Sequence, residues 1–434
     1  MTTPKADLMA NSGDPNEFDV VIVGAGMAGL SAAIEAADGG ARVVVLDARS
    51  TIGGRARTRE RDGYAMNEGG HALYVDGAAM TFLRELGREP RGGVPDAGAG
   101  IGVDGDREGA FPTGLVSLLR TPLLKGDRVA MARLFAKLPR LDPASYAHTT
   151  VDVAVRDLLG GGRAARLAHG LFRLSSYFND PARTSADAGL VQLQMVVRNG
   201  VRYLDNGWQT MVDSLEKICI DRGVEIRTAT KATAVRPTGE GYLVTAGDEL
   251  SCRRVVVAGS PQLAAGLLGD VASVTRQWAA DARPATVAAL DVGFPRDWQG
   301  RRPFALGIDQ PTYLSMHAPV ADLAPEGHTL LHVMRYHPND ETPDADADRA
   351  ACEALLERVS PRWRSEADHV SFSPRLVAST DQPSAACGGL GGRPPVTVPG
   401  HSGLFVAGDW VGPEGVLVDA SVASGRAAGQ AASR

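Results

Sequence analysis

A glycine-rich turn near the start of the chain restricts most strongly what this sequence can fold into. Residues 24–29 read GAGMAG, a GxGxxG pattern that follows the β-branched run Phe18 to Val23 and opens the alanine-rich run Met27 to Ala37. The first run is typical of a buried parallel strand and the second of a helix. Arg42 to Leu46 is a second apolar strand. The order strand–turn–helix–strand predicts the βαβ unit of a Rossmann-type α/β fold.

The three glycines of this turn have different physical tasks. Gly24 allows a tight turn, Gly26 lets the backbone approach a pyrophosphate, and Gly29 lets the helix and the strand pack closely. Met27 and Ala28 open the helix, whose N-terminus attracts an anion because its first N–H groups have no partner within the helix. A strand, a glycine turn and a helix in this register predict a dinucleotide-binding site.

The residues after the second strand favour FAD over NAD. Asp47 ends this strand, where its carboxylate can accept hydrogen bonds from a ribose diol. Gly53 and Gly54 then form a second glycine pair, and Arg55 offers a fork of donors to phosphate oxygens. An NAD-binding domain has no need of this second phosphate loop. From this part of the chain the predicted cofactor-binding residues are Gly24, Gly26, Met27, Ala28, Gly29, Asp47, Ala48, Arg49, Gly53, Gly54 and Arg55.

The composition argues against several other classes of protein. The chain has 434 residues and a net charge of −6, which disfavours nucleic acid as a partner. The four cysteines are widely spaced, with no CxxC pair and no Cys/His cluster, so neither a disulfide frame nor a metal site is predicted. The polar residues 1–17 lack the apolar centre of a signal peptide, and no apolar run approaches the roughly 20 residues that span a bilayer. We expect a flexible N-terminal tail and a cytoplasmic location.

The rest of the pattern indicates two interleaved domains. Residues 87–200 read mainly as helices with Gly and Pro breaks, whereas residues 283–377 read mainly as strands around one helix, 346–359. Residues 404–407 form a last apolar strand that runs into a glycine-rich turn and a small-residue helix. The expected organisation is an FAD-binding domain of residues 18–86, 201–282 and 396–434, and an α+β substrate-binding domain of residues 87–200 and 283–395.

Both ends of the chain resemble one known family. Residues 19–48, followed by GGRART, are similar to the N-terminal signature of the flavin-containing amine oxidase and phytoene desaturase superfamily. Gly403 to Trp410 resembles the second FAD motif of this family, and Gly415 to Gly425 resembles the segment that runs beside the flavin ring into the last helix. The resemblance implies a glutathione-reductase-like FAD-binding domain in which Asp409 binds the ribityl chain. It adds Gly408, Asp409, Leu417 and Val418 to the predicted cofactor-binding residues.

Weaker matches to the family extend the predicted site. Gly69, Gly70 and His71 fit the loop that brings backbone against the flavin ring, with His71 at the ring edge or in the substrate cavity; alternatively, His71 only fixes this loop. Val224 to Val235 resembles the adenine-contacting strand of the family, and this match makes Ala232 the residue whose backbone meets adenine.

A missing lysine is the main departure from the amine oxidases of this family. These enzymes usually carry a lysine, on a substrate-domain strand, that holds a water beside the flavin, but this chain has no lysine after Lys231. Leu417 stands where an amine-caging aromatic residue would be expected. No cysteine lies near the closing motif, so FAD should be bound without a covalent link. Segments 311–315 and 323–333 resemble the substrate-domain hairpin of phytoene-desaturase-like proteins.

The sequence therefore predicts an FAD-dependent desaturase or oxidase that acts on a hydrophobic small molecule, with oxygen or a quinone as electron acceptor. One alternative is an amine or amino-acid oxidase that produces hydrogen peroxide. A more remote one is a non-catalytic binder of prenylated proteins, like the Rab GDP-dissociation inhibitors of the same fold. No catalytic base is assigned. The candidates are His71, Tyr313 and Tyr336, while His332 and His337 lie in or beside the same strands.

The stretch 114–141 carries a cluster of basic residues and an apolar stripe. Met131, Leu134, Phe135 and Leu138 recur at helical spacing, and the stretch contains one acidic residue. A basic amphipathic helix of this kind predicts peripheral contact with an anionic membrane. The alternative is a substrate-domain helix that packs its stripe on the core and exposes its basic face to solvent.

Overall fold

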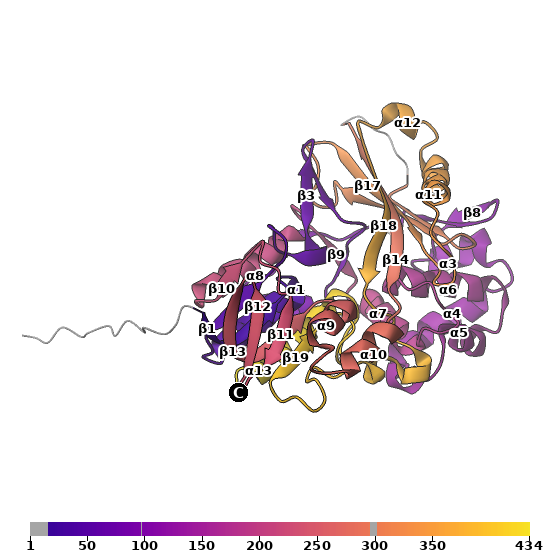
Figure 1. The fold of residues 1–434 in the computed structure, drawn as a ribbon. Coiled ribbons are helices and arrows are strands. Elements are labelled where there is room, and N and C mark those ends of the chain that lie inside the picture. The colour runs from indigo at the N-terminus through magenta and orange to yellow at the C-terminus, as the bar shows by residue number, and fades with distance from the viewer. Residues whose placement is uncertain (1–15, 97, 296–301) are drawn as a thin grey trace, which may run out of the picture.

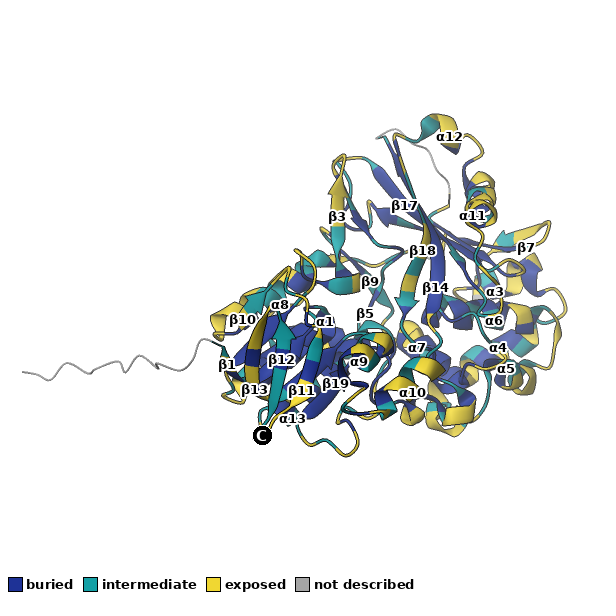
Figure 2. Cartoon of the chain, in the orientation of Figure 1, coloured by how far each residue is buried: buried dark blue, intermediate teal, exposed yellow. Residues whose placement is uncertain are grey.

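A computed structural model describes residues 16–96, 98–295 and 302–434, so residues 1–15 of the expected tail lie outside the described residues. Two seven-stranded sheets lie side by side, and the chain passes between them several times (Figure 1). Buried residues concentrate in the central strands of both sheets and in the helix faces that cover them (Figure 2). The division into two domains at the expected boundaries stays a prediction; the sheets themselves are described below.

The first sheet has a parallel core in the order β10–β2–β1–β13–β19. The long strand β13 also pairs with β12 in antiparallel fashion, and β12 pairs with β11. Parallel strands that are covered on both faces read as continuous apolar runs, and β2 and β19 are buried along their whole length. The strands are β1 (Glu17–Val23), β2 (Val43–Leu46), β10 (Glu225–Arg227), β11 (Ala234–Pro237), β12 (Tyr242–Ala246), β13 (Asp248–Ala258) and β19 (Leu404–Ala407).

Helices from both ends of the chain pack together on one face of this sheet. The first and the last helix, α1 and α13, contact each other along their length because small residues face each other: a Cβ atom on Gly425 would lie 2.2 Å from the carbonyl oxygen of Ala28. Strands β11 and β12 with α9 cover the other face. The helices around this sheet are α1 (Met27–Asp38), α2 (Ala78–Glu85), α8 (Gln209–Asp221), α9 (Pro261–Leu268), α10 (Val274–Asp281) and α13 (Val418–Ala432).

The second sheet has the order β18–β14–β17–β16–β15–β7–β8. All neighbouring pairs are antiparallel except β15 with β7. The expected hairpin of residues 311–333 is present, with β16 paired to β17. The strands are β7 (Ile101–Asp104), β8 (Arg107–Ala110), β14 (Ala285–Phe294), β15 (Phe304–Gly307), β16 (Thr312–Ala318), β17 (Thr329–Tyr336) and β18 (His369–Ser379).

One helix covers one face of this sheet, and a group of helices packs against part of the other (Figure 1). Helix α11 packs on Leu290, Leu331 and Val333, whereas the helical group packs on Val287 and Met334. Side chains alternate along a strand, so these two sets mark opposite faces. The helices are α3 (Leu115–Arg120), α4 (Arg128–Lys137), α5 (Val151–Leu159), α6 (Gly162–Ser176), α7 (Ala186–Arg198), α11 (Ala345–Val359) and α12 (Trp363–Glu366).

Short elements connect the two large sheets. Strand β9 pairs with both β5 and β6, and β3 forms a hairpin with β4. These elements carry the loops that pass from the first sheet to the second. Their bounds are β3 (Thr58–Arg61), β4 (Tyr64–Asn67), β5 (Leu73–Tyr74), β6 (Gly92–Gly93) and β9 (Val201–Leu204), with short 3-10 helices at η1 (Gly54–Ala56), η2 (Pro122–Leu124), η3 (Leu138–Arg140), η4 (Pro143–Tyr146), η5 (Ala385–Cys387) and η6 (Gly389–Gly392).

Two expected elements differ in the structure. The single strand predicted over residues 225–235 is wrong: β10 ends at Arg227 and β11 begins at Ala234, because Ala229 has a positive φ of 51° that no strand accommodates. Residues 87–200 are not only helical, since β7 and β8 join the edge of the second sheet. Glycine-rich, short edge strands such as these carry little apolar alternation, so the pattern did not reveal them.

The stretch 114–141 is also broken, into α3, η2, α4 and η3, so the prediction of one amphipathic helix is wrong. Pro122 and Gly126 interrupt it, as expected from the backbone preferences of these residues. Met131, Leu134 and Leu138 of the apolar stripe are buried in the core under the second sheet, as the alternative interpretation predicted. Among the described residues, no helix combines the length and the apolar character that crossing a bilayer requires.

Candidate active site

Packing inside the protein requires two of the three glycines in the first turn. A Cβ atom on Gly24 would lie 2.2 Å from the carbonyl oxygen of Ala258, and the φ of Gly24 is +107°. A Cβ atom on Gly29 would lie 1.8 Å from the carbonyl oxygen of Gly24. Strands β1 and β13 and helix α1 therefore approach too closely for side chains here, which explains both glycines without any ligand.

Gly26 is different, because the protein itself does not require a glycine at this position. Among the described residues, a Cβ atom on Gly26 would meet nothing nearer than the carbonyl oxygen of Gly53, at 4.0 Å. Gly26 is also the N-cap of α1, and no side chain caps this helix. The N–H groups of the first turn, which include those of Met27 and Ala28, thus lack a side-chain acceptor at the positive end of the helix. The open space and the uncapped helix fit a pyrophosphate.

Asp47 is tied into the same turn. Its Oδ2 atom accepts a hydrogen bond from the N–H of Ala25 at 2.8 Å, and its Oδ1 atom accepts one from the N–H of Arg49 at 2.9 Å. Ala48 and Arg49 are exposed beside it. A carboxylate has about four acceptor sites, so Asp47 keeps capacity for the hydroxyls of a ribose.

The second glycine pair lies against the first turn. The N–H of Gly53 donates to the carbonyl oxygen of Ala25 at 2.8 Å, and a Cβ atom on Gly54 would lie 3.5 Å from the Cα atom of Gly26. Gly53 and Gly54 both have positive φ values, +111° and +58°, which favour glycine. The two predicted phosphate loops therefore form one continuous backbone surface.

Arg55 connects the two ends of the chain. Its Nη1 atom donates to Oδ2 of Asp409 at 2.7 Å, and Asp409 is fully buried whereas the Arg55 side chain is 42% exposed. Asp409 also accepts hydrogen bonds from the hydroxyl of Ser379 and from the backbone and side chain of Thr380. Burial acts to raise the pKa of Asp409, but the charge of Arg55 and these hydrogen bonds outweigh it and hold the pKa below its usual range.

Sequence reasoning missed Arg393, which shapes the loop after Asp409. Its guanidinium donates to the carbonyl oxygens of Asp409 at 3.1 Å, Glu414 at 3.1 Å and Gly415 at 3.0 Å. Burial lowers the pKa of Arg393 to about 10. This residue lies in the Gly/Pro-rich connection 383–399, where no local pattern distinguishes it from a surface arginine.

The start of the last helix has an unusual backbone. Leu417 has a φ of +57°, which is strained for a branched side chain, and Val418 begins α13. Asp419 is buried, and its Oδ1 atom accepts a hydrogen bond from the N–H of Ala79 at 2.9 Å. Its Oδ2 atom has no partner among the described residues, and burial raises its pKa to about 7. Asp419 was another residue that the sequence reasoning missed.

The loop of Gly69, Gly70 and His71 lies between the two large sheets. The N–H of Gly70 donates to Sδ of Met334 on β17 at 3.3 Å, and the hydroxyl of Tyr177 donates to the carbonyl oxygen of Gly70. The loop is thus held against the face of the second sheet that α11 does not cover.

His71 fixes this loop to the second glycine pair. Its Nδ1 atom lies 2.9 Å from the carbonyl oxygen of Gly69, and its Nε2 atom lies 3.3 Å from that of Arg55. The imidazole packs edge-on against Trp208, with ring centroids 4.6 Å apart. Burial lowers the pKa of His71, so the ring is neutral near pH 7. These contacts favour the loop-fixing interpretation of His71.

Tyr313 and Tyr336 belong to a cluster of aromatic residues around Gly70. The hydroxyl oxygens of Tyr313 and Tyr203 lie 3.2 Å apart, and the rings of Tyr336 and Tyr177 meet edge to face with centroids 5.8 Å apart. Burial raises the pKa of both Tyr313 and Tyr336, which keeps them neutral. The Tyr336 hydroxyl has no hydrogen-bond partner among the described residues. The cluster offers an apolar surface with a few polar ends.

Ala232 lies in the loop between β10 and β11, not in a strand. It is 6% exposed and packs in the core on the outer face of the first sheet. The neighbouring backbone is held by the N–H of Thr230, which donates to the carbonyl oxygen of Asp47 at 2.7 Å. The structure therefore brings this loop to the end of β2, beside Asp47, although by a turn and not by an extended strand.

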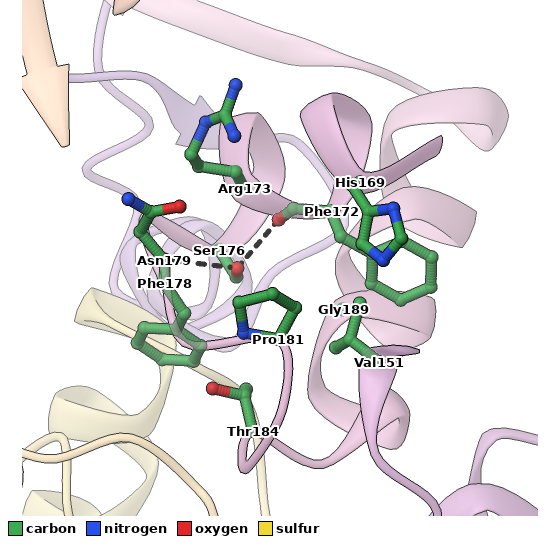
Figure 3. Close-up of a pocket in the computed structure, with 10 residues that line it drawn as sticks. All are labelled: Val151, His169, Phe172, Arg173, Ser176, Phe178, Asn179, Pro181, Thr184 and Gly189. Carbon is green, nitrogen blue, oxygen red and sulfur yellow. Dashed lines mark hydrogen bonds between the residues drawn. The ribbon is translucent and has the colours of Figure 1, made fainter. Parts of the chain in front are cut away.

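A small pocket of ≈ 30 Å³ lies among the helices that pack on the second sheet (Figure 3). Helix α6 contributes Arg173 and Ser176, and the following segment contributes Phe178 and Asn179. The amide of Asn179 donates to the carbonyl oxygen of Tyr336 at 3.1 Å, and Arg173 lies over the Tyr336 ring. The pocket therefore backs onto the aromatic cluster, and none of the predicted cofactor-binding residues lines it.

The two glycine loops, the uncapped helix α1 and the second sheet opposite them define an α/β protein whose first sheet has the features of a dinucleotide-binding fold. The chain belongs to the flavin containing amine oxidoreductase family, whose model matches residues 27–432. This match confirms the family and the Rossmann-type fold class expected from the two end motifs.

Individual relatives and structures agree with this family. The chain is 29% identical over 307 residues to a hydroxyneurosporene desaturase of Rhodobacter capsulatus, a match that covers 60% of each chain. It is 62% identical over 51 residues to an L-amino-acid oxidase of Crotalus adamanteus, 12% of this chain and 10% of that one. The matches thus span less than two thirds of these curated relatives. The structure of cyclohexylamine oxidase from Brevibacterium oxydans superposes with a TM-score of 0.69 at 20% identity, covering 96% of this chain and 98% of that one, which shows the shared fold.

Proposed function

We propose that this protein is an FAD-dependent desaturase or oxidase that removes hydride from a hydrophobic small molecule. The observation that carries the proposal is Gly26: its position is open, beside an uncapped helix, and nothing in the protein requires a glycine there. A bound FAD supplies the hydride acceptor at its N5 atom, so the protein needs no redox group of its own and has to align the substrate and exclude water.

The residues that would hold FAD form three groups. The first turn and Asp47 bind the pyrophosphate and the adenosine ribose, and the second turn with Arg55 and Asp409 lies beside the ribityl chain. The loop 69–71 and the start of α13 border the flavin ring, where Leu417 and Val418 present the helix N-terminus. The free cysteines support non-covalent binding, because Cys219, Cys252, Cys352 and Cys387 all lie outside these loops.

The aromatic cluster supports a hydrophobic substrate. Tyr313, Tyr336 and Met334 lie on the sheet face that meets Gly70, and burial keeps the tyrosines neutral. The 29% identity over 307 residues to a hydroxyneurosporene desaturase favours a substrate of extended apolar character. The absence of lysine after Lys231 disfavours amine oxidation of the usual kind. An amino-acid oxidase is the alternative, which the short match to the Crotalus enzyme favours.

The purified protein tests this proposal in two steps. Its visible absorption should show bound flavin, and acid precipitation should release FAD into the supernatant because no covalent link holds it. Anaerobic incubation with a carotenoid and isoprenoid panel should then bleach the flavin, whereas amines and amino acids should not. Re-oxidation by air or by a soluble quinone identifies the electron acceptor. Broad bleaching by amines with hydrogen peroxide formation would favour the alternative, and a colourless protein that takes up no added FAD would favour a non-catalytic binder.

Peripheral membrane contact forms a second part of the proposal. Helices α3 and α4 leave Val116, Leu119 and Val129 between 55% and 63% exposed, beside the basic residues Arg120 and Lys125. Apolar and cationic side chains together suit an anionic bilayer surface, where an apolar substrate would also reside.

Replacing Val116 and Leu119 by Asp is expected to abolish flotation with vesicles that contain a third phosphatidylserine, while bound FAD is unchanged. Each Asp removes apolar area and adds a charge that the anionic surface repels. The matched control is Ile220→Asp, at an equally exposed position on α8. If the unmodified protein does not float with these vesicles at low salt, membrane contact is wrong.

A further inference from the structure

A row of polar side chains crosses the second sheet on the face that meets the 69–71 loop. In the strand register, Asp291 of β14 lies opposite His332 of β17, which lies opposite Ser315 of β16. Residues directly opposite one another in antiparallel strands point to the same face. These three side chains therefore form one row.

The next row along the strands places this polar row beside the active site. Met334 and Tyr313 are opposite each other, two residues along β17 and β16 from the polar row, and so lie on the same face. A Cβ atom on Gly70 would lie 3.0 Å from Cε of Met334 and 3.7 Å from Cε1 of Tyr313. The backbone of Gly70 thus rests on one row, and His332 lies in the adjacent row.

His332 forms a buried pair with a carboxylate. Its Nδ1 atom lies 2.5 Å from Oδ1 of Asp291, the His332 side chain is 0% exposed, and the Asp291 side chain is 9% exposed. With Nδ1 donating to the carboxylate, Nε2 is the ring nitrogen that can accept a proton. No described residue forms a hydrogen bond with Nε2.

His317 lies beside this pair and is also buried. Its Nε2 atom lies 2.9 Å from the hydroxyl of Ser315, and its ring meets the His332 ring edge to face at 4.3 Å. The Tyr203 ring stacks on His317 with centroids 3.7 Å apart. Burial and the neighbouring His332 and His71 hold the pKa of His317 well below its usual range. His317 is therefore a neutral neighbour of the pair.

A buried polar atom without a partner costs about 1–3 kcal/mol. Other histidines of the described residues also carry one, such as His317 and His369, but His332 differs in that a buried carboxylate orients its ring. The protein could bury an apolar residue at position 332, as it does at Met334 on the same face. Instead it orients an imidazole with a carboxylate and leaves the other nitrogen unpaired next to the loop of the active site. A base oriented by a third group is the arrangement that proton abstraction requires.

We propose that His332, oriented by Asp291, accepts the proton that the substrate loses when the flavin is reduced. This proposal rests on the proposed function. Hydride leaves one substrate carbon for the flavin, and the adjacent C–H bond gives its proton to Nε2 of His332 while its electron pair forms the new double bond. The hydride carries its own electron pair to the flavin, so the substrate is oxidised and the flavin reduced by two electrons, and Asp291 stabilises the imidazolium that forms.

The test measures the midpoint potential of the bound flavin as a function of pH. Xanthine and xanthine oxidase supply the electrons, and a dye of known potential serves as the reference. If Nε2 of His332 takes up a proton when the flavin is reduced, the potential of the unmodified protein should contain a segment that falls more steeply with pH. His332→Gln should lose this steeper segment. Asp291→Asn should weaken it, because no carboxylate then stabilises the imidazolium.

His337→Gln is the matched control. This buried histidine also pairs with a carboxylate, Asp348 at 2.9 Å, but its other nitrogen is occupied by the hydroxyl of Thr286. It should leave the potential–pH curve unchanged. If His332→Gln binds FAD fully and its curve superimposes on that of the unmodified protein, the proposal is wrong. If His332→Gln does not fold, the potential–pH curve of Asp291→Asn is compared with that of the unmodified protein instead, and superimposed curves again mean that the proposal is wrong. A protein that binds no FAD would instead contradict the proposed function.

Discussion

Gly26→Val is expected to give a folded protein that has lost its FAD. The new side chain would project into the open space beside the N-terminus of α1, where the pyrophosphate must approach, and not into the protein. Losing two charge-assisted hydrogen bonds of about 1.5 kcal/mol each weakens FAD binding by at least about 100-fold, since each 1.4 kcal/mol is tenfold. Gly24 and Gly29 cannot serve this purpose, because their Cβ atoms would collide with backbone and unfold the turn.

The measurement is the ratio of absorbance at 450 nm to 280 nm after gel filtration, with circular dichroism to verify the fold. Gly266→Val, near the C-terminal end of α9, is the control, because a Cβ atom there meets no described atom outside its own helix within 4 Å. It should retain full flavin, because the same Gly→Val change there lies outside both glycine loops. Stoichiometric FAD in a folded Gly26→Val protein would show that the cofactor binds elsewhere.

The first glycine turn was predictable because its constraints are local. Gly29 is forced by its contact with Gly24 within one strand–turn–helix unit, and the strand and helix patterns on either side have distinct periods. The register of β16 with β17 was similarly accessible, since one connection joins two apolar runs. The end of β10 at Arg227 was not predictable, because the positive φ of Ala229 gives no signal in the sequence: alanine lacks the conformational freedom of glycine.

The rest of the site depends on contacts between distant segments. Arg55 and Asp409 are 354 positions apart, and their pairing with Thr380 needs the end of β18 to reach the first sheet. Arg393 and Asp291 read as an ordinary surface arginine and an ordinary strand aspartate until the fold buries them. Residue type and spacing cannot show such burial, which is why the motif residues were found and their supporting residues were not.

Asp409→Ala is expected to remove both bound FAD and a measurable part of the folding stability. The family resemblance predicts that Asp409 binds the ribityl chain, so its removal should weaken FAD binding. In the structure Asp409 also pairs with Arg55 and accepts hydrogen bonds from Ser379 and Thr380. Removing one partner of a buried pair costs about 3–5 kcal/mol, and the lower value applies here because water can reach the Arg55 side chain. Thermal unfolding of the flavin-free protein measures this loss of folding stability separately from the loss of FAD.

Glu35→Ala separates the two effects, because Glu35 pairs with Arg426 at 2.6 Å between α1 and α13, away from the glycine loops. It should lower stability but retain FAD. The contribution of Asp409 to folding stability also has a predictable pH dependence. Since the pKa of Asp409 is lower in the folded state than in the unfolded chain, its contribution is present above about pH 4 and is lost as the pH falls through the folded-state pKa. The unfolding temperatures of the unmodified and Asp409→Ala proteins should therefore converge at acid pH. A constant difference would mean that the carboxylate charge does not stabilise the fold. If Asp409→Ala retained FAD, Asp409 would not belong to the cofactor site.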